Sequence, residues 1–229
     1  MTCANGGHEL SSGSAFCGSC GATHPEAIPE PAASGPTVTK EKFKSIAGRV
    51  WMTVRAVLLN PVEALPAAFQ TFSPRESLET GIAFAVLFDI CALFGLYMML
   101  PRWAGQPGIG DLLKILIFGF VPPAALTGAI FLARKIFRAT AGTIESDVFM
   151  AGICVIPTGI LLLFSGVLGI ANIEVSAVIA VFALSYTILI LFTGSTRIAG
   201  MAQVQAAPAV PVIILAAGWI SKIVFAALL

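Results

Sequence analysis

Residues 148–170 read VFMAGICVIPTGILLLFSGVLGI, a run in which no Asp, Glu, Lys or Arg occurs. At a rise of about 1.5 Å per residue, a helix of this length crosses the roughly 30 Å of hydrocarbon in a bilayer. Four further stretches, each with at most one charged residue, fill the chain between Gly81 and Leu229: 81–100, 112–132, 175–193 and 210–229. We therefore predict an all-α, polytopic membrane bundle of five transmembrane helices.

The composition of the whole chain agrees with this prediction. Hydrophobic residues make up 57% of the sequence and charged residues 11%, whereas soluble domains carry roughly 25% charged residues. The net charge of +1 provides no basic field, so we expect no nucleic-acid partner. Residues 1–20 contain no apolar run, which predicts that no cleavable signal peptide is present and that the first span directs insertion.

The loops between the predicted spans differ in their content of Lys and Arg. Ten of these residues fall on one side of the membrane: Lys40, Lys42, Lys44, Arg49, Arg55, Arg75, Arg134, Lys135, Arg138 and Arg197. Arg102 and Lys114 fall on the other side. Because cytoplasmic loops carry the excess of basic residues, we predict a multi-pass protein of the cell membrane with a cytoplasmic N-terminus. Five spans then place the C-terminus on the opposite side.

The polar N-terminal part divides into three regions in front of the membrane domain, residues 73–229. Residues 1–21 hold three of the five cysteines and form a small head. Residues 22–38 contain four prolines and few large apolar side chains, so we interpret them as a semi-extended linker. Residues 39–72 are predicted to form basic, amphipathic helices at the membrane interface.

The head contains a motif that is typical of small metal sites. Cys17 and Cys20 stand in a Cys-x-x-Cys-Gly turn, where two thiolates can hold one ion. A structural zinc site normally has four ligands; Cys3 supplies a third, and His8 is the candidate for the fourth. A disulfide between Cys17 and Cys20 is disfavoured, because the head is predicted to face a reducing cytoplasm.

Residues 3–21 resemble the small zinc ribbons of bacterial proteins, in which the Cys-x-x-Cys-Gly motif occurs twice. The chain departs from this pattern at Gly6, which stands where those ribbons have their second cysteine. Two interpretations remain open. Either zinc is the cofactor and is bound by Cys3, His8, Cys17 and Cys20, or the ribbon is degenerate and binds zinc weakly or not at all.

Residues 40–59 read KEKFKSIAGRVWMTVRAVLL, with apolar residues at helical spacing on one face. Asn60-Pro61 ends this segment, since a residue before proline is pushed out of the helical region. A basic helix with Trp on its apolar side suits a membrane surface; it could equally pack on the protein's own spans, and the two arrangements are compatible. The predicted surface residues are Lys40, Lys42, Lys44, Arg49, Trp51 and Arg55.

Prolines and a capping motif predict local features of the membrane domain. In Ser73-Pro74-Arg75-Glu76, Ser73 can cap a helix and Glu76 can close a capping box. Pro122-Pro123 in the second span and Pro157 in the third predict kinks. The short connection at 171–174 predicts a tight hairpin of the third and fourth spans.

Asp89 and Lys222 are charged residues inside predicted spans, and such residues are candidates for function. An Asp89–Lys222 pair within the bundle would serve as structural glue or as part of an ion path. Alternatively, Asp89 accepts hydrogen bonds from polar neighbours, and Lys222 snorkels outward as an interfacial anchor. The neighbours considered for Asp89 are Ser185, Tyr186 and Thr187.

The sequence contains no recognisable catalytic motif. It lacks a phosphate-binding glycine loop with a lysine, a His-Glu-x-x-His helix and a Gly-x-Ser-x-Gly elbow, and no predicted span contains histidine. We therefore expect no enzymatic activity and assign no catalytic residue.

The lead-in Val57-Leu58-Leu59-Asn60-Pro61, followed by Phe69, and the basic loop 134–138 before a third span with an internal proline form a recognisable pattern. With the five-span count, the cytoplasmic N-terminus and the close third and fourth spans, residues 45–229 resemble the Yip family. Its eukaryotic members bind Ypt/Rab GTPases and act in vesicle traffic and membrane shaping. The resemblance implies no catalytic residues. The combination of a Yip-like membrane domain with a zinc ribbon resembles proteins of bacteria or archaea.

These features support two hypotheses. In the first, the chain is an integral membrane adaptor whose head recruits a cytoplasmic protein through residues 1–38, while the basic helix lies on the inner leaflet and the bundle anchors or deforms the bilayer. In the second, it is a transporter or channel for a small solute or ion that uses Asp89, Lys222 and the break at Pro122-Pro123. The sequence leaves the formation of a homo-oligomer open.

Overall fold

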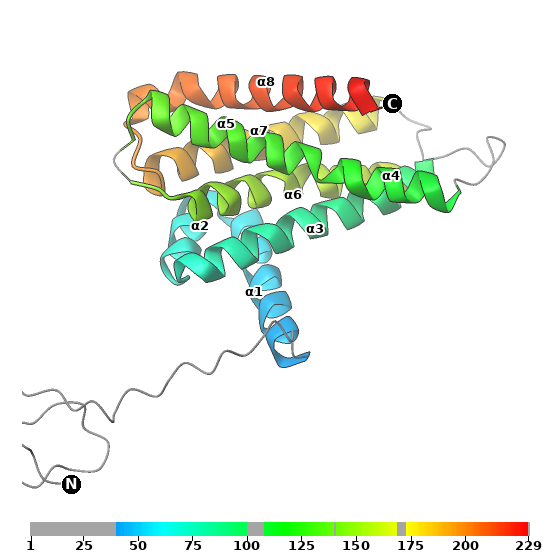
Figure 1. The fold of residues 1–229 in the computed structure, drawn as a ribbon, viewed down its shortest axis with the longest axis horizontal. Coiled ribbons are helices and arrows are strands. Elements are labelled where there is room, and N and C mark those ends of the chain that lie inside the picture. The colour runs from blue at the N-terminus through cyan, green and yellow to red at the C-terminus, as the bar shows by residue number, and fades with distance from the viewer. Residues whose placement is uncertain (1–39, 100–107, 140, 169–172, 229) are drawn as a thin grey trace, which may run out of the picture. The chain divides into compact units, whose positions relative to one another are not determined.

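The computed structural model describes residues 40–99, 108–139, 141–168 and 173–228 (Figure 1). Within these residues every regular element is an α-helix, and five helical spans are long and apolar enough to cross a membrane. The prediction of an all-α, multi-pass bundle in contact with lipid is confirmed for this part of the chain. The predicted zinc-ribbon head and linker, residues 1–38, lie outside it.

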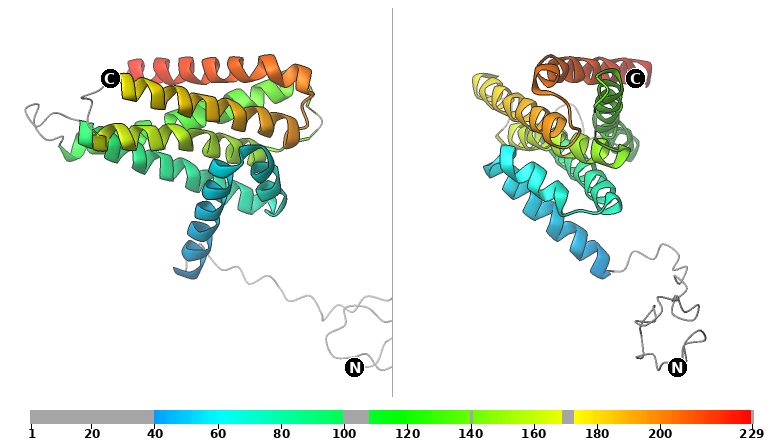
Figure 2. Two further views of the ribbon diagram at one scale, coloured as in Figure 1. Left: turned by 180° about the vertical axis from the view of Figure 1, so that it is seen from behind. Right: turned by 90° about the vertical axis from the view of Figure 1, so that its left-hand side faces the viewer.

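Two helices precede the bundle, α1 (Lys40–Leu59) and α2 (Pro61–Gln70). The bundle itself consists of α3 (Pro74–Met99), α4 (Ile109–Gly119), α5 (Val121–Ile136), α6 (Ile144–Leu168), α7 (Ile173–Arg197) and α8 (Gln203–Leu228). α4 and α5 together make the second span. The long helices lie side by side in Figures 1 and 2, and α1 runs across them.

The capping motif at the start of α3 forms as predicted. The backbone N–H of Ser73 donates to the Glu76 carboxylate at 3.0 Å, and the backbone N–H of Glu76 donates to Ser73 Oγ at 3.4 Å. Pro74 occupies the first helical position, where its missing N–H leaves no bond unmade. The sequence therefore fixes where the first long helix begins.

α8 extends beyond the predicted fifth span at its N-terminal side. α8 begins at Gln203 rather than near Val210, and Pro208 and Pro211 lie inside it. The prediction followed hydrophobicity, which marks the part of a helix that lipid surrounds, whereas the helix itself continues wherever its backbone bonds are made.

The second span is divided at Phe120, beside the two prolines for which a kink is predicted. α4 ends at Gly119 and α5 begins at Val121, while Phe120 between them keeps right-handed helical dihedrals, φ −78° and ψ −14°. Pro122 and Pro123 occupy the first turn of α5, where proline is tolerated because the N–H groups there have no partner within their own helix. The two prolines thus act as the start of a new helix.

The closest helix contact in the described residues joins α3 and α6, which run parallel. A side chain at Gly152 would overlap the carbonyl group of Gly81, and a side chain at Gly166 would overlap the carbonyl group of Gly95. Between these two contacts, Gly159 accommodates the ring of Phe88. Because helices in lipid gain no hydrophobic energy from association, small residues that let backbones approach provide the packing energy.

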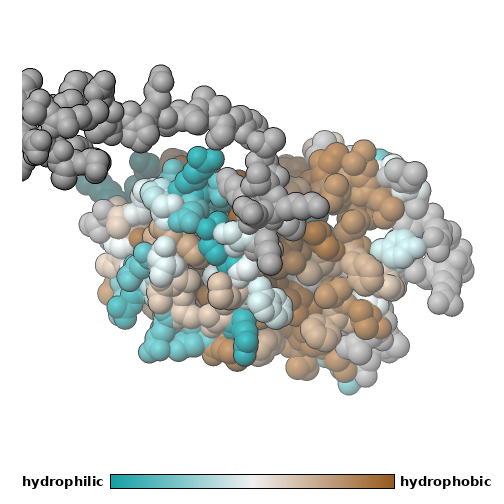
Figure 3. Space-filling view, turned by 90° about the horizontal axis from the view of Figure 1, so that it is seen from below, coloured by the Kyte–Doolittle hydropathy of each residue, from teal (hydrophilic) through white to brown (hydrophobic). Residues whose placement is uncertain are grey.

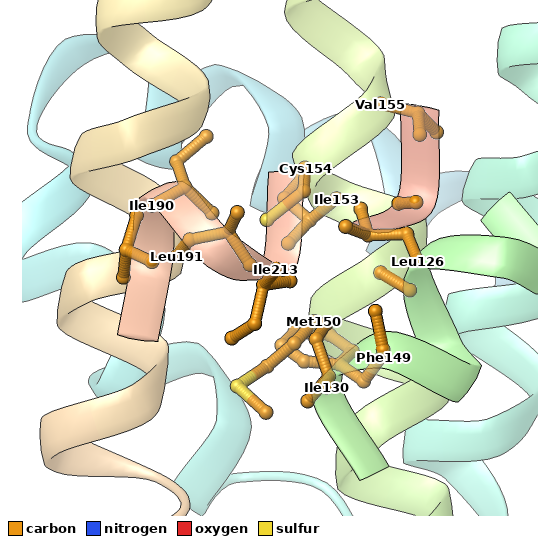
Figure 4. Packing of buried hydrophobic residues seen from close by; sticks show 14 of the residues in the cluster. Leu126, Ile130, Phe149, Met150, Ile153, Cys154, Val155, Ile190, Leu191 and Ile213 are labelled. Atoms are coloured by element: carbon orange, nitrogen blue, oxygen red, sulfur yellow. The ribbon is translucent and has the colours of Figure 1, made fainter. Parts of the chain in front are cut away.

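α6 is the central helix of the bundle. In its spanning segment 56% of the residues are buried, against 28–33% in the other four spans. Figure 4 shows its side chains Phe149, Met150 and Ile153 packed with Ile213 of α8 and Leu191 of α7. All five are buried, with exposed fractions of at most 2%. The remaining spans are therefore arranged around α6.

Charged side chains gather at one end of the bundle. The guanidinium of Arg134 binds the fully buried Asp147 carboxylate, with Nη2 at 2.7 Å from Oδ2, and its Nη1 donates to the Gly142 carbonyl at 3.0 Å. On the face shown in Figure 3, hydrophilic residues collect toward one end of the bundle and hydrophobic residues toward the other. The bidentate ion pair between Arg134 and Asp147 ties the connection between α5 and α6 to the bundle.

We predict that Gly152→Ala destabilises the protein and that Gly128→Ala does not. A Cβ atom at Gly152 forces the backbones of α3 and α6 apart, which costs about 1–3 kcal/mol, whereas a Cβ atom at Gly128 of α5 meets no neighbouring atom. Thermal unfolding of the purified protein in detergent measures the difference. Equal melting temperatures for the two variants would show that the α3–α6 contact does not limit stability.

Candidate functional site

Asp89 lies near the middle of the first span, within α3, and is 1% exposed. Its neighbours one turn away on the same helix are the buried, apolar Ala85 and Ala92. Both of its carboxylate oxygens lack a hydrogen-bond partner among the described residues. An uncompensated buried carboxylate is costly, so this side chain needs a proton, a cation or a donor.

The carboxylate of Asp89 packs directly against the break in the second span. A side chain at Gly119, the last residue of α4, would overlap Asp89 Oδ1. Pro122 and Pro123 have no N–H, so the carbonyl groups of Phe118 and Gly119 lose the donors that a continuous helix would supply. The surroundings of Asp89 therefore include hydrogen-bond acceptors that the helix has left without their usual partners.

A cavity of about 650 Å³ lies beside this break. Its wall contains residues from all five spans: Phe88, Ala92, Leu96, Ile115, Phe118, Gly119, Pro122, Leu126, Cys154, Val155, Thr158, Leu162, Thr187, Ile214, Ala217, Gly218, Ser221 and Phe225. Most of these positions fall in the central part of their span. The cavity is thus at the depth where the hydrocarbon of the bilayer would surround the protein.

Hydroxyl groups in the cavity wall are largely used by the helices themselves. Thr187 Oγ1 lies within hydrogen-bonding distance of two backbone carbonyl oxygens, that of Cys154 at 3.1 Å and that of Ala183 at 3.0 Å, and donates to them. Ser221 Oγ donates to the carbonyl of Ala217 at 2.7 Å. The wall therefore offers a mostly apolar surface to anything that enters.

Lys222 does not reach Asp89. Its side chain is exposed on α8, and its Nζ lies 5.1 Å from the centroid of the Trp219 ring. The Asp89–Lys222 pair considered from the sequence is therefore absent, and the position agrees with an interfacial anchor, since Lys and Trp are both suited to the edge of a bilayer.

The polar neighbours considered for Asp89 also bind elsewhere. Ser185 Oγ donates to the Val181 carbonyl at 2.8 Å, and the hydroxyl of Tyr186 donates to the Leu58 carbonyl at 3.0 Å. Thr187 is occupied by backbone carbonyl groups, as described above. The Tyr186 bond instead attaches the end of α1 to α7.

The predicted surface residues of α1 separate into two groups. Trp51 is 68% exposed, and Arg55 is exposed as well. Arg49 instead binds α3, with Nη1 at 2.6 Å from Glu76 Oε1. The side chains of Lys40, Lys42 and Lys44 lie outside the described residues. α1 therefore combines attachment to the bundle with an exposed face, as the sequence allowed.

The predicted zinc ligands, Cys3, His8, Cys17 and Cys20, lie in the part of the chain that the structure does not describe. Among the described residues, no group of three or more His, Cys, Asp or Glu side chains could hold a metal ion.

Sequence reasoning did not find Gly119 or the cavity. The signal for Gly119 was its position just before Pro122-Pro123, where a residue without a side chain leaves room for a neighbouring helix. The cavity depends on which faces of the five spans meet, which a single sequence does not reveal.

Comparison with known proteins gives no relative: no protein-family model, curated protein or solved structure matches the chain.

We predict that Gly119→Ala destabilises the protein through its contact with Asp89 and that Asp89→Ala relieves this effect. The added methyl group overlaps the carboxylate, which costs about 1–3 kcal/mol, and a truncated residue 89 removes the overlap. Unfolding of the wild type, both single variants and the double variant gives the coupling energy. Gly110→Ala, with open space around the new Cβ atom, is the matched control on α4. Additive effects of the two substitutions would contradict the contact.

Proposed function

We propose that the chain is a transporter that carries a small, largely apolar solute through its bundle. The observation that supports this proposal is the cavity of about 650 Å³ at mid-membrane depth, with a wall built from all five spans. Ligand sites in proteins commonly measure about 300–1,000 Å³ and are mostly apolar with few polar groups. The cavity fits this description in both volume and lining.

The break between α4 and α5 supports transport rather than simple binding. Substrate and ion sites of secondary transporters lie near the bilayer midplane, where discontinuous helices meet. Phe118, Gly119 and Pro122 belong to the break and also line the cavity. A change in the angle between α4 and α5 would therefore reshape the cavity wall directly.

The charged end of the bundle sets the proposed orientation. Arg134, Asp147 and the Arg49–Glu76 pair lie at this end, together with the exposed Lys135 and Arg138. In the proposed arrangement this end faces the cytoplasm, in line with the excess of basic residues there.

We predict that Gly218→Leu blocks transport, whereas Gly128→Leu leaves it intact. Gly218 lines the cavity, and a Cβ atom there meets no neighbouring atom, so the leucine side chain can occupy the cavity without distorting the backbone. Gly128 is exposed on α5, away from the cavity wall, and is equally free of close neighbours. Both variants should fold, because each adds a leucine at an unobstructed helical position.

The assay is uptake by vesicles that contain the purified full-length protein. Three fluorescent dyes of similar size, one cationic, one neutral and one anionic, define which solute class is carried. We expect wild-type flux above that of protein-free vesicles for at least one dye, about a tenfold reduction for Gly218→Leu, corresponding to roughly 1.4 kcal/mol, and wild-type flux for Gly128→Leu. Absence of flux for all three dyes, or equal flux in both variants, contradicts the proposal.

A membrane adaptor is the second candidate, and the exposed face of α1 favours it. Trp51, Met52 and Leu59 are each at least 65% exposed, next to the exposed Arg55. A helix with large apolar side chains and a basic residue on one face binds at a lipid surface. α1 would then hold residues 1–38 close to the membrane, where a zinc-binding head could recruit a cytoplasmic protein. The resemblance to Yip proteins supports a membrane-organising role of this kind.

The adaptor proposal predicts that deletion of residues 1–38 changes which proteins copurify with the chain from native membranes. A matched control replaces Cys17 and Cys20 by serine in the full-length chain, which should remove the same partners if zinc shapes the head. An unchanged set of copurifying proteins after the deletion rules out recruitment by the head.

A further inference from the structure

We infer that Asp89, together with the backbone of the α4–α5 break, binds a small monovalent cation in the middle of the membrane. This inference deepens the proposed transporter function by naming an ion that would act beside the solute. It follows from the burial of one carboxylate, the identity of the groups around it and its position next to the cavity.

The carboxylate of Asp89 is buried without a hydrogen-bonded partner in the part of the chain that the structure describes. Asp89 is 1% exposed, and both of its oxygens are without a hydrogen-bond partner among the described residues. The base considered as its partner from the sequence, Lys222, lies over the Trp219 ring on the exposed side of α8. By contrast, the other buried acid of the spans, Asp147, has the guanidinium of Arg134. A bound cation would neutralise the negative charge of Asp89, as Arg134 neutralises that of Asp147.

The backbone at the α4–α5 break contacts the carboxylate of Asp89. Gly119 has no side chain, so its backbone lies directly against Asp89 Oδ1. The carbonyl groups of Phe118 and Gly119 receive no N–H from Pro122 and Pro123. Carboxylate and carbonyl oxygens are all acceptors, and unwound backbone carbonyl groups coordinate Na⁺ or a proton in secondary transporters. This combination favours a cation over an anion or a hydrogen-bond acceptor.

Few other titratable groups lie near Asp89 along the helices that meet there. Within one turn of Asp89 on α3, and within one turn of Gly119 on the second span, no other acidic or basic residue occurs; the thiol of Cys91 is two positions from Asp89. Lys114 of α4 lies near the start of the second span, one and a half turns before Gly119. A single positive charge is therefore sufficient to neutralise the site, which selects a monovalent ion.

Gly119 connects this ion site to the solute cavity. It contacts Asp89 on one side and lines the cavity on the other. A cation bound to Asp89 beside this contact would stabilise one arrangement of α4 relative to α3, and the shape of the cavity wall would change with it. Binding of the ion and of the solute would then be coupled through one short segment of backbone.

The test measures the thermal stability of the full-length protein in detergent. Chlorides of Na⁺, Li⁺ and K⁺ are titrated at constant ionic strength against choline chloride. A ligand that binds only the folded state raises the melting temperature, on the order of 5–10 °C at a hundredfold excess over its Kd for a chain of this size. We expect such a saturable rise for wild type with at least one metal ion and its loss in Asp89→Asn. Glu63→Gln, an acid-to-amide change on the exposed face of α2, should keep the wild-type response.

A pH series distinguishes the proton from the metal ions as the bound cation. If the ion is a proton, none of the salts acts specifically, and lowering the pH stabilises wild type relative to Asp89→Asn. The inference is overturned if wild type and Asp89→Asn respond alike to every salt and to pH. A cation response without dye uptake would support the ion site and contradict the transport proposal. Dye uptake that is unchanged in Asp89→Asn, without a cation response, would support transport and contradict the ion site.

Discussion

The backbone contact between α3 and α6 determines the positions of the other helices. Lipid solvates apolar side chains as well as another helix does, so the spans associate only where packing is closer than lipid allows. Gly81 and Gly95 on α3 meet Gly152 and Gly166 on α6, and no side chain fits between the two backbones at either point. Gly81 and Gly95 are fourteen residues apart on α3, and Gly152 and Gly166 are fourteen residues apart on α6. This spacing of two heptads suits parallel helices that cross at about 20°.

This contact also explains why the bundle leaves a cavity. α3 and α6 are held together by glycines near both ends of their contact, while Phe88 occupies the corresponding position between them and packs against Gly159. The second span is divided at Phe120. Phe88, Phe118 and Leu126 line a partly open cavity beside this division.

The sequence predicted the features that depend on local physics. The five spans follow from hydrophobic length, the start of α3 from its capping box, and the disturbance at Pro122-Pro123 from the missing N–H groups. It did not predict that Asp89 lacks a hydrogen-bond partner among the described residues, because hydrogen bonding by Ser185 or pairing with Lys222 depends on how the helices are rotated. The equal spacing of Gly81–Gly95 and Gly152–Gly166 was available as a signal for the α3–α6 contact, although small residues are too frequent in spans for either pair alone to be informative.

The burial of Asp89 is itself a consequence of the α3–α6 contact. Gly81, Phe88 and Gly95 mark the face of α3 that packs on α6, and one residue further along a helix turns by about 100°. Asp89 is therefore rotated away from α6 by the same packing that fixes α3, and it meets the backbone at Gly119 instead. The acid cannot turn outward without disturbing the glycine contacts. The packing of α3 on α6 thus holds the Asp89 carboxylate against the backbone at the end of α4.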